Sequence, residues 1–335
     1  MNGVLDWGVE VVRALQAHRS HLADLFNLAV TQLGHQLALV LLVAFVIWCV
    51  DRRLGLRLGA LLVGSGVVNV LCKAWWRGPR PYQFARSVAL IGPPELSPGV
   101  PSGHAQLTLT AWGTLARGLN RRWAVAVAAL VVLLVAGSRL YLGAHFPHDV
   151  LVGLALGATL LVLAPHLERW LVERFQHLSP RGQLVAGGAP SLLLPLWPHR
   201  DLVALGGVLA GLCAGLRYAP VEESSPKRRG PGWTAASFAA GALALVALYL
   251  ALGWLARRTA ASGQPEDWYP APPSLALALG LALRWLRYGV TGLWIAGGWP
   301  ALAPRLGLPV VGTRPPSGQP TPQPWPQPPA DADRS

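Results

Sequence analysis

The sequence is poor in charge, in cysteine and above all in lysine. Only 13% of its 335 residues are charged and 53% are apolar, a composition that excludes an ordinary soluble domain. The cysteines are odd in number and lie inside apolar runs, which argues against a disulfide framework or a zinc site: Cys49, Cys72 and Cys213. The formal net charge is +13, but the basic residues are scattered between apolar runs, which argues against a nucleic-acid partner. We therefore expect the chain to lie in a bilayer, in contact with membrane lipids.

Long apolar runs predict an all-α, polytopic membrane bundle of about nine spans, because about 20 apolar residues are needed for a helix to cross about 30 Å of hydrocarbon. Arg284 and Arg287 lie in the middle of the last run, so they should face protein or water rather than lipid. The predicted spans are Leu28–Val50, Leu54–Trp76, His104–Leu119, Trp123–Leu142, Asp149–Ala164, Leu184–Trp197, Leu202–Leu216, Ala235–Leu255 and Ser274–Trp299.

Composition divides the chain into four regions. Residues 1–26 mix apolar and basic side chains and are expected to form an amphipathic helix, Val4–Leu25, at the membrane interface. Residues 27–170 are expected to form the core bundle, which carries the polar motifs. Residues 171–303 add further membrane spans. Residues 304–335 are rich in Pro and Gln, which predicts a disordered tail.

Arginine-rich loops indicate the orientation of the bundle. Residues 51–53, 117–122 and 169–181 carry these arginines and fall on one side of the predicted spans. The positive-inside rule makes that side cytoplasmic, and the basic loop Glu222–Gly232 is expected there too. The sequence therefore predicts an integral protein of a bacterial-type cytoplasmic membrane, with its polar motifs facing outward.

The first motif joins two cations through a stiff loop. Lys73 and Arg80 flank Gly78-Pro79, and Pro81 follows directly. The prolines would hold both cations at a fixed separation, as a clamp for phosphate requires. Lysine occurs only twice in the chain, against 26 arginines, which favours a specific role for Lys73. The alternative is a lysine that merely snorkels from the end of a span.

The second motif is Pro101-Ser102-Gly103-His104, at the start of a predicted helix. Ser102 suits the N-cap position, and Gly103 allows a ligand to approach the backbone closely. The free amides of a helix start attract anions, and His104 in the first turn would point its ring at the bound group. Taken alone, the motif is also compatible with a simple helix cap.

The third motif places a histidine beside a carboxylate. Pro147 fits the first position of a helix, so Phe146 would be the N-cap and Asp149 would lie in the first turn, within reach of His145. A carboxylate on one ring nitrogen leaves the other free to act as a nucleophile. Arg139 on the preceding span would supply a bidentate phosphate contact. The alternative is an interfacial histidine and a carboxylate that favours the helix dipole.

Together the three motifs resemble the complete signature of the type 2 phosphatidic acid phosphatase superfamily, which includes glucose-6-phosphatases and vanadium haloperoxidases. The resemblance covers roughly residues 54 to 165 and leaves the C-terminal third outside it. The matching motifs are Lys73-x6-Arg80-Pro81, Pro101-Ser102-Gly103-His104 and Ser138-Arg139-x5-His145-x3-Asp149.

The resemblance implies a division of roles. His145 would attack phosphorus to form a phosphohistidine, Asp149 would orient it, and His104 would protonate the leaving oxygen and later help to activate water. No metal and no cofactor would be needed, because cations of the protein neutralise the developing charge. The phosphoryl oxygens would be held by Lys73, Arg80, Arg139, Ser102 and the Gly103 amide.

The expected function is therefore that of a metal-independent membrane phosphatase. The expected substrate is a lipid phosphate or pyrophosphate, such as undecaprenyl pyrophosphate or phosphatidate, and the motifs do not choose among them. Alternatives are a phosphatase of a soluble ester and a non-catalytic lipid-phosphate binder or transporter. A haloperoxidase would share the pocket, but the many spans speak against it. The sequence leaves the oligomeric state open.

Overall fold

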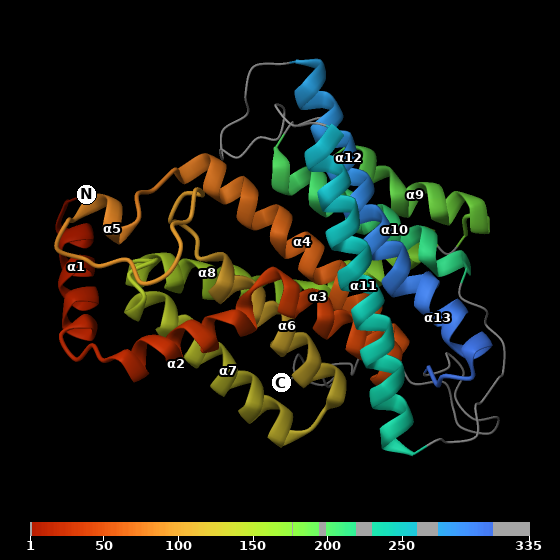
Figure 1. Ribbon diagram of the computed structural model, residues 1–335, viewed down its shortest axis with the longest axis horizontal. Helices are drawn as coiled ribbons and strands as arrows, with labels where there is room; N and C mark the ends of the chain where they lie inside the picture. Colours follow the sequence, from red (N-terminus) through yellow and green to blue (C-terminus); the bar gives the residue numbers. More distant parts are fainter. Residues whose placement is uncertain (1, 176, 194–198, 219–229, 260–273, 311–335) are drawn as a thin grey trace, which may run out of the picture.

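The computed structural model describes residues 2–175, 177–193, 199–218, 230–259 and 274–310, which fold into helices joined by turns and loops (Figure 1). The all-α prediction is confirmed for this part of the chain. Most of the expected tail and of the expected basic loop lie outside the described residues.

The first half of the chain contains α1 (Asn2–Gln16), α2 (His21–Thr31), η1 (Gln32–Gly34), α3 (Gln36–Phe45), η2 (Val46–Val50), α4 (Arg52–Trp76), α5 (Pro81–Phe84), α6 (Gly103–Leu119), α7 (Arg122–Tyr141) and α8 (Pro147–Phe175). The second half contains α9 (Pro180–Leu193), α10 (Arg200–Tyr218), α11 (Pro231–Thr259), α12 (Leu275–Leu293), η4 (Trp294–Gly298), α13 (Trp299–Leu302) and η5 (Ala303–Leu306).

In the part of the chain that the structure describes, fewer helices have the length and hydropathy of a membrane span than the nine that the sequence suggested. α6 and α9 are short, at 17 and 14 residues, and α12 carries two arginines near its middle. A bent pair, α2 with η1 and α3 with η2, forms a fifth candidate if its two arms, at 53°, count as one span. Among the described residues the four other candidates are Arg52–Phe84, Arg122–Tyr141, Pro147–Trp170 and Pro231–Arg258. The chain is thus built as an integral membrane protein.

The N-terminal region forms two helices where the sequence suggested one. α1 ends at Gln16, and Ser20 caps α2 by accepting a hydrogen bond from the amide of Ala23 at 3.2 Å. The apolar face of α1 is buried against the bundle, with Val12 fully enclosed beside Phe146. α1 therefore packs on the bundle as well as presenting a polar face.

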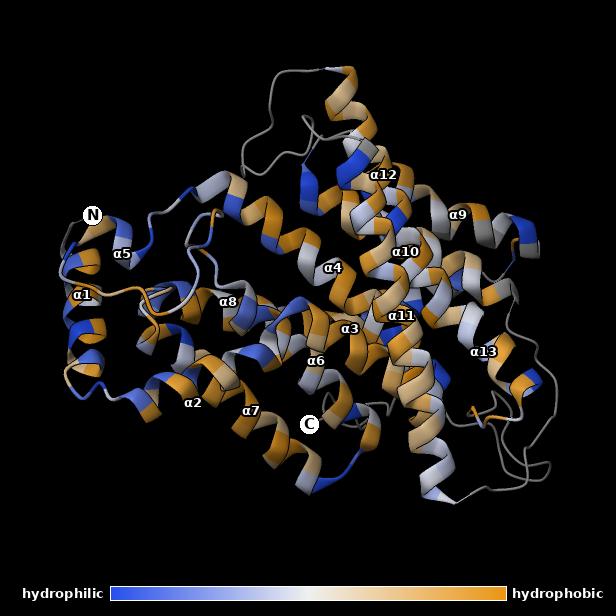
Figure 2. Cartoon of the chain, in the orientation of Figure 1, coloured by the Kyte–Doolittle hydropathy of each residue, from blue (hydrophilic) through white to orange (hydrophobic). Residues whose placement is uncertain are grey.

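α6 is the central helix of the first half, packed against α4, α7 and α8 (Figure 1). Figure 2 shows that the long helices α4, α7 and α11 are mostly apolar and that hydrophilic residues gather in the turns between helices. α4 and α7 end, and α6 and α8 begin, at one end of the bundle. At the other end, Arg57 at the start of α4 pairs with Glu168 of α8 at 2.7 Å. The alternation expected from the sequence therefore holds, and the three motifs share one end.

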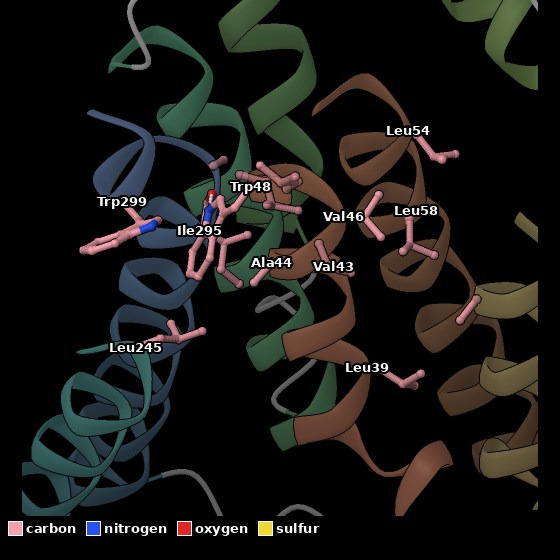
Figure 3. Packing of buried hydrophobic residues seen from close by; sticks show 14 of the residues in the cluster. Leu39, Val43, Ala44, Val46, Trp48, Leu54, Leu58, Leu245, Ile295 and Trp299 are labelled. Atoms are coloured by element: carbon pink, nitrogen blue, oxygen red, sulfur yellow. Dashed lines mark hydrogen bonds between the residues drawn. The ribbon is translucent and has the colours of Figure 1, made fainter. Parts of the chain in front are cut away.

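The second half packs on α3, η2 and α4 (Figure 1). A buried apolar cluster joins the two halves, with Trp48 of η2 facing Ile295 and Trp299 (Figure 3). The indole nitrogen of Trp48 donates to the carbonyl of Ile295 at 2.8 Å, and Arg52 donates to the carbonyl of Ala296 at 3.1 Å. These contacts join the helix that leads into the first motif to η4.

The two arginines of α12 face protein, as predicted. Arg284 Nε donates to the carbonyl of Arg200 at 2.8 Å, and Arg287 Nε donates to the carbonyl of Tyr249 at 3.0 Å. The guanidinium of Arg287 also lies 3.5 Å from the centre of the Tyr249 ring. Arg284 lies 5.3 Å from the centre of the Tyr288 ring and 3.7 Å from the Asp201 carboxylate, so protein groups contact both guanidinium groups.

Candidate active site

The predicted site residues lie at helix ends. Lys73 is in the last turn of α4, Arg139 in the last turn of α7 and Asp149 in the first turn of α8. Arg80 is the N-cap of α5, and His145 lies in the short connection between α7 and α8. All five of these side chains are buried, and those of Arg80 and Asp149 are completely enclosed. The fold therefore gathers the first and third motifs in the interior.

Asp149 holds His145 through the start of α8. Nδ1 of His145 lies 3.2 Å from Oδ2 of Asp149, and the amide of Phe146 donates to the same oxygen at 3.0 Å. α8 begins at Pro147, so the carboxylate lies in the first turn, near the positive end of the helix dipole. The pairing predicted from the position of Pro147 is confirmed.

The contacts of His145 define the state of its ring. Because Asp149 is an acceptor, Nδ1 carries the ring proton and Nε2 carries the lone pair. Arg80 Nη1 lies 3.2 Å from Nε2 and donates to it. Burial, together with the charges of Arg80 and Arg139, holds the pKa of His145 well below its usual range, so the ring is neutral at physiological pH. A neutral ring fixed in this way has Nε2 as its nucleophilic atom.

The cations of the first motif meet on the loop before α6. Lys73 Nζ donates to Ser97 Oγ at 3.3 Å and to the carbonyl of Pro98. Arg80 Nη2 donates to the same hydroxyl at 2.9 Å, and Arg80 Nε donates to the carbonyl of Ser97 at 2.8 Å. The shared hydroxyl brings the two cations together, as the sequence predicted for a clamp.

Glu95 completes this cluster, although none of the three sequence motifs contains it. Its carboxylate bridges Arg80 Nη2, at 2.7 Å, and Arg139 Nη2. Burial alone would raise the pKa of Glu95, but the charges of Arg139 and Arg80 outweigh it and lower the pKa to about 2. Glu95 follows Gly92-Pro93-Pro94 in an irregular loop, where no periodicity predicts which way a side chain points.

The N-terminal region also supplies site residues that the motifs do not contain. Arg139 Nη1 donates to Thr31 Oγ1 of α2 at 2.9 Å, and Thr31 is buried. Gly34 lies against α6: a Cβ placed there would be 3.1 Å from the ring of His104 and 2.8 Å from Thr108 Oγ1. A glycine in the bend before α3 therefore lets the chain approach the second motif.

The second motif caps α6 as predicted, but not through the serine hydroxyl. Ser102 is the N-cap residue, and its amide donates to the carbonyl of Asp149 at 2.9 Å, which ties the second motif to the third. Its hydroxyl is fully buried and, among the described residues, has no hydrogen-bond partner. A buried hydroxyl without a partner can donate a hydrogen bond to a ligand. Gly103 follows, and a Cβ there would lie 3.3 Å from Asn69 Oδ1.

A buried amide network fixes the start of α6 against α4. Asn69 Nδ2 donates to Gln106 Oε1 at 2.8 Å and to the carbonyl of Pro101 at 3.4 Å. Gln106 Nε2 in turn donates to the carbonyl of Ser65 at 2.9 Å. Such satisfied networks make an interior rigid. The sequence motifs do not include these residues, although polar side chains within apolar spans are a signal that could have indicated the network.

His104 lies beside the cluster without a direct bond to it. It occupies the first turn of α6 and is half-buried, and no hydrogen bond of its ring is seen within the part of the chain that the structure describes. It is close enough to Glu95 to contribute to the low pKa of that carboxyl. In the same described part, no three His, Cys, Asp or Glu side chains are grouped so that they could hold a metal ion. Positive charge is supplied here by Lys73, Arg80 and Arg139.

Fold and site together define a helical membrane protein with a buried histidine–carboxylate pair beside three cations. Residues 54–173 match the model of the PAP2 superfamily. The resemblance predicted from the three motifs is thereby confirmed. Thr31 and Gly34 lie outside the matched segment, so the site extends beyond it.

Curated relatives match part of the chain. Over 196 residues it is 30% identical to glucose-6-phosphatase catalytic subunit 1 of Haplochromis nubilus, covering 49% of this chain and 54% of that protein. It is 30% identical over 117 residues to undecaprenyl-diphosphatase of Sulfolobus acidocaldarius, covering 35% and 56% of the two chains. It is 38% identical over 108 residues to decaprenylphosphoryl-5-phosphoribose phosphatase of Mycobacterium tuberculosis, covering 32% and 58%. The chain spans about half the length of the curated relatives it matches.

Among solved structures, the crystal structure of Aquifex aeolicus LpxE is similar to the chain with a TM-score of 0.42 and 27% identity, covering 46% of this chain and 92% of that one.

Proposed function

We propose that this chain is a metal-independent membrane phosphatase that hydrolyses lipid phosphate or pyrophosphate monoesters through a phosphohistidine at His145. One observation carries the proposal: the ring of His145 touches Asp149 with one nitrogen and Arg80 with the other, each at 3.2 Å. The lone pair of Nε2 therefore faces a guanidinium suited to hold a phosphoryl group. Nucleophile and phosphorus would be adjacent as soon as the group is bound.

In the first step Nε2 of His145 attacks phosphorus, an N–P bond forms, and the P–O bond to the leaving group breaks. His104 gives its proton to the leaving oxygen, and Asp149 stabilises the positive charge that appears on the His145 ring. In the second step water attacks phosphorus, His104 takes a proton from that water, and the N–P bond breaks. The products are the dephosphorylated alcohol, or the monophosphate from a pyrophosphate, and inorganic phosphate.

Charge on the transferred group is balanced by the protein. Lys73, Arg80 and Arg139 would neutralise the equatorial oxygens, whose charge the transition state redistributes. The unpaired hydroxyl of Ser102 and the Gly103 amide at the start of α6 would add two neutral donors. Because the three basic side chains neutralise the phosphoryl charge, this scheme does not require a divalent ion.

A lipid substrate fits the position of the site. The motifs share one end of the membrane bundle, and α1 packs across that end with its apolar face inward. A lipid could present its phosphate there while its chains stay in the bilayer. Two relatives in the comparison, the undecaprenyl-diphosphatase and the decaprenylphosphoryl-5-phosphoribose phosphatase, are named for polyprenyl-linked substrates, which favours a polyprenyl phosphate or pyrophosphate first. Phosphatidate is the next candidate.

A soluble phosphate ester is the second candidate substrate. It is favoured by the alignment with glucose-6-phosphatase catalytic subunit 1, which runs over 196 residues and covers a larger share of this chain than the two polyprenyl-linked relatives do. The proposed chemistry at His145 would be the same for either substrate. A non-catalytic lipid-phosphate binder would need the cations but not the contact between His145 and Asp149.

We place the site on the outer face of a bacterial-type cytoplasmic membrane. Arg52, Arg53, Arg121 and Arg122 lie at the helix ends opposite to the motifs. The positive-inside rule assigns these arginines to the cytoplasm. A substrate that cannot cross the membrane should therefore be cleaved by intact cells that express the chain.

The test is phosphate release by the detergent-purified full chain in the presence of EDTA. Undecaprenyl pyrophosphate, phosphatidate and glucose 6-phosphate are offered separately, with His145→Ala as the inactive variant and Glu168→Gln as a control on the far end of α8. We expect release by the unchanged chain and by Glu168→Gln, and none by His145→Ala with an unchanged melting temperature. Turnover by a folded His145→Ala protein would refute the phosphohistidine. Loss of all activity in EDTA with recovery in magnesium would refute the metal-independent scheme.

A further inference from the structure

The donors that a phosphate would need are already engaged by the chain itself. Arg80 and Arg139 both donate to the Glu95 carboxylate, and Lys73 and Arg80 both donate to Ser97 Oγ. The segment Glu95–Pro98 thus contacts every cation of the site. A substrate phosphate and this segment compete for the same hydrogen-bond donors.

The Glu95 carboxylate resembles a phosphate in the features that matter for binding. Each of its two oxygens meets a different arginine, Oε2 with Arg80 and Oε1 with Arg139. Charge-assisted hydrogen bonds of this kind, between a guanidinium and a carboxylate, are about twice as strong as neutral ones. The low pKa of Glu95, about 2, means that the carboxylate remains charged under ordinary conditions. It is therefore a permanent anion in the cluster.

Glu95 is also the member of the cluster that can leave it most easily. Its side chain is 32% exposed, whereas those of Arg80 and Arg139 are 0% and 6% exposed. The backbone of Glu95 is held separately, because Tyr82 donates its hydroxyl to the Glu95 carbonyl at 3.1 Å. Rotation of the side chain toward solvent would release both guanidinium groups from the carboxylate without unpacking a helix.

We propose that Glu95 is the resident anion of the site: a substrate phosphate displaces its carboxylate from Arg80 and Arg139, and Glu95 thereby sets how tightly the site binds phosphate. The inference rests on the proposed phosphatase function, because it takes the two arginines as the phosphate ligands. Glu95 acts here as an affinity-determining residue and takes no part in bond making. It would also favour release of inorganic phosphate, because the carboxylate returns as the product leaves.

Charge argues in the same direction. Arg80 and Arg139 are positively charged, and the Glu95 carboxylate that bridges them is negatively charged. A neutral side chain at position 95 raises the net charge of the site by one, which favours a dianionic ligand. Glutamine is the suitable replacement because it keeps the shape of the side chain but carries no negative charge that would attract the arginines.

The test is the dissociation constant of inorganic phosphate, measured by titration calorimetry on the detergent-purified full chain. We expect Glu95→Gln to bind phosphate about tenfold more tightly than the unchanged chain, and Glu95→Ala to shift in the same direction. Glu168→Gln, which removes the charge of a glutamate paired with Arg57 at the other end of the bundle, should leave the constant unchanged. In turnover assays Glu95→Gln should lower KM and slow product release.

The outcomes separate this inference from the proposed function. Equal or weaker phosphate binding by both Glu95 variants, with binding by the unchanged chain intact, would overturn the inference and show that Glu95 holds the arginines in place. In that case the proposed phosphatase would stand. Absence of phosphate binding in the unchanged chain and in both variants, all with cooperative thermal unfolding, would overturn the phosphate site and the inference together. Two replacements are used so that poor folding of one leaves the other to decide.

Discussion

The motif-bearing segment and the C-terminal helices both bury arginines, but they do so in different surroundings. Arg80 and Arg139 converge from different helix ends on one carboxylate. Arg284 and Arg287 of α12 each donate to a backbone carbonyl of a neighbouring helix, and Arg284 also lies 3.7 Å from the half-exposed Asp201 carboxylate of α10. In the first region cations are gathered around an exchangeable anion. In the second they are spread over fixed acceptors.

The helices of the two regions also meet in different ways. α4 and α6 are joined by side-chain amides, through Asn69 and Gln106. α10 and α12 touch through glycine: a Cβ placed on Gly211 would overlap the carbonyl oxygen of Gly289. Small residues let membrane helices approach closely and gain packing contacts. We infer that substitutions in the first region mainly change chemistry, whereas substitutions in the second mainly change stability.

Among the substitutions that test this contrast between the two regions, the largest effect is expected from replacing His104. Replacement by Ala should lower kcat by about 10² to 10⁴, the range for loss of a general acid, because the leaving oxygen would depart unprotonated. The ring makes no hydrogen bond within the described residues, so the melting temperature should hardly change. Stopped-flow phosphate release and thermal unfolding measure the two quantities. A substrate with an activated leaving group should restore part of the rate, and equal losses on both substrates would argue against the acid role.

The second prediction concerns pH and His145. Because burial and the neighbouring arginines hold its pKa well below 6.5, the ring stays neutral as the pH falls through 6.5, and the nucleophile is lost only at more acidic pH. The profile of kcat/KM, corrected for ionisation of the substrate phosphate, should therefore show no acid limb near 6.5 that arises from His145. A limb at 6.5 that is assigned to the His145 ring would contradict its buried, cation-flanked position.

Local sequence signals predicted the site where they concern adjacent residues. Pro147 predicted the start of α8 and, with it, the contact between His145 and Asp149. Ser102 predicted the start of α6. Contacts between distant segments gave no such signal. Thr31 and Glu95 reach Arg139 from segments 108 and 44 residues away, and neither lies in a periodic pattern that would fix its direction.

The number of spans shows a second limit of the sequence. Hydropathy marks α6 and α12 as apolar runs, but it carries no information on which runs are enclosed by others. α6 is 17 residues long and packs against three other helices, which places polar side chains such as Gln106 and Thr110 in its buried faces. The break between α1 and α2 was missed because Ser20 lies inside a mixed apolar and basic stretch. Packing partners, absent from a single sequence, decide these cases.

The third prediction tests the glycine contact of α10. Gly211→Ala should destabilise the protein by about 1–3 kcal/mol, the usual range for overpacking, because the new methyl group meets the backbone of α12 and not a flexible side chain. The melting temperature in detergent measures the loss. Gly64→Ala in α4 is the matched control, since a Cβ there has no atom within 4 Å. A drop in kcat of the folded Gly211→Ala protein would contradict the contrast between the two regions, because it would show that the packing of the C-terminal helices affects the catalytic step.

The smallest effect is expected from Tyr288→Phe. The hydroxyl of Tyr288 lies 3.1 Å from that of Tyr249, and the Tyr288 side chain is buried. Its removal takes away one hydrogen bond between α11 and α12 and should lower stability by about 0.5–1.5 kcal/mol. The Arg287 guanidinium, seated on the Tyr249 ring and bonded to its carbonyl, should stay in place.

A double-mutant cycle with Tyr249→Phe isolates the hydroxyl pair, because the two residues share that contact and the cycle cancels effects that each substitution has on its own. Melting temperatures of the two single variants and the double variant supply the coupling energy, and kcat/KM should be the same in all of them. A coupling near zero would mean that the two hydroxyls bond elsewhere. A fall in kcat/KM that exceeds the loss of folded protein would instead show that α11 and α12 act on the site through η2 and α4, the elements that connect them to Lys73.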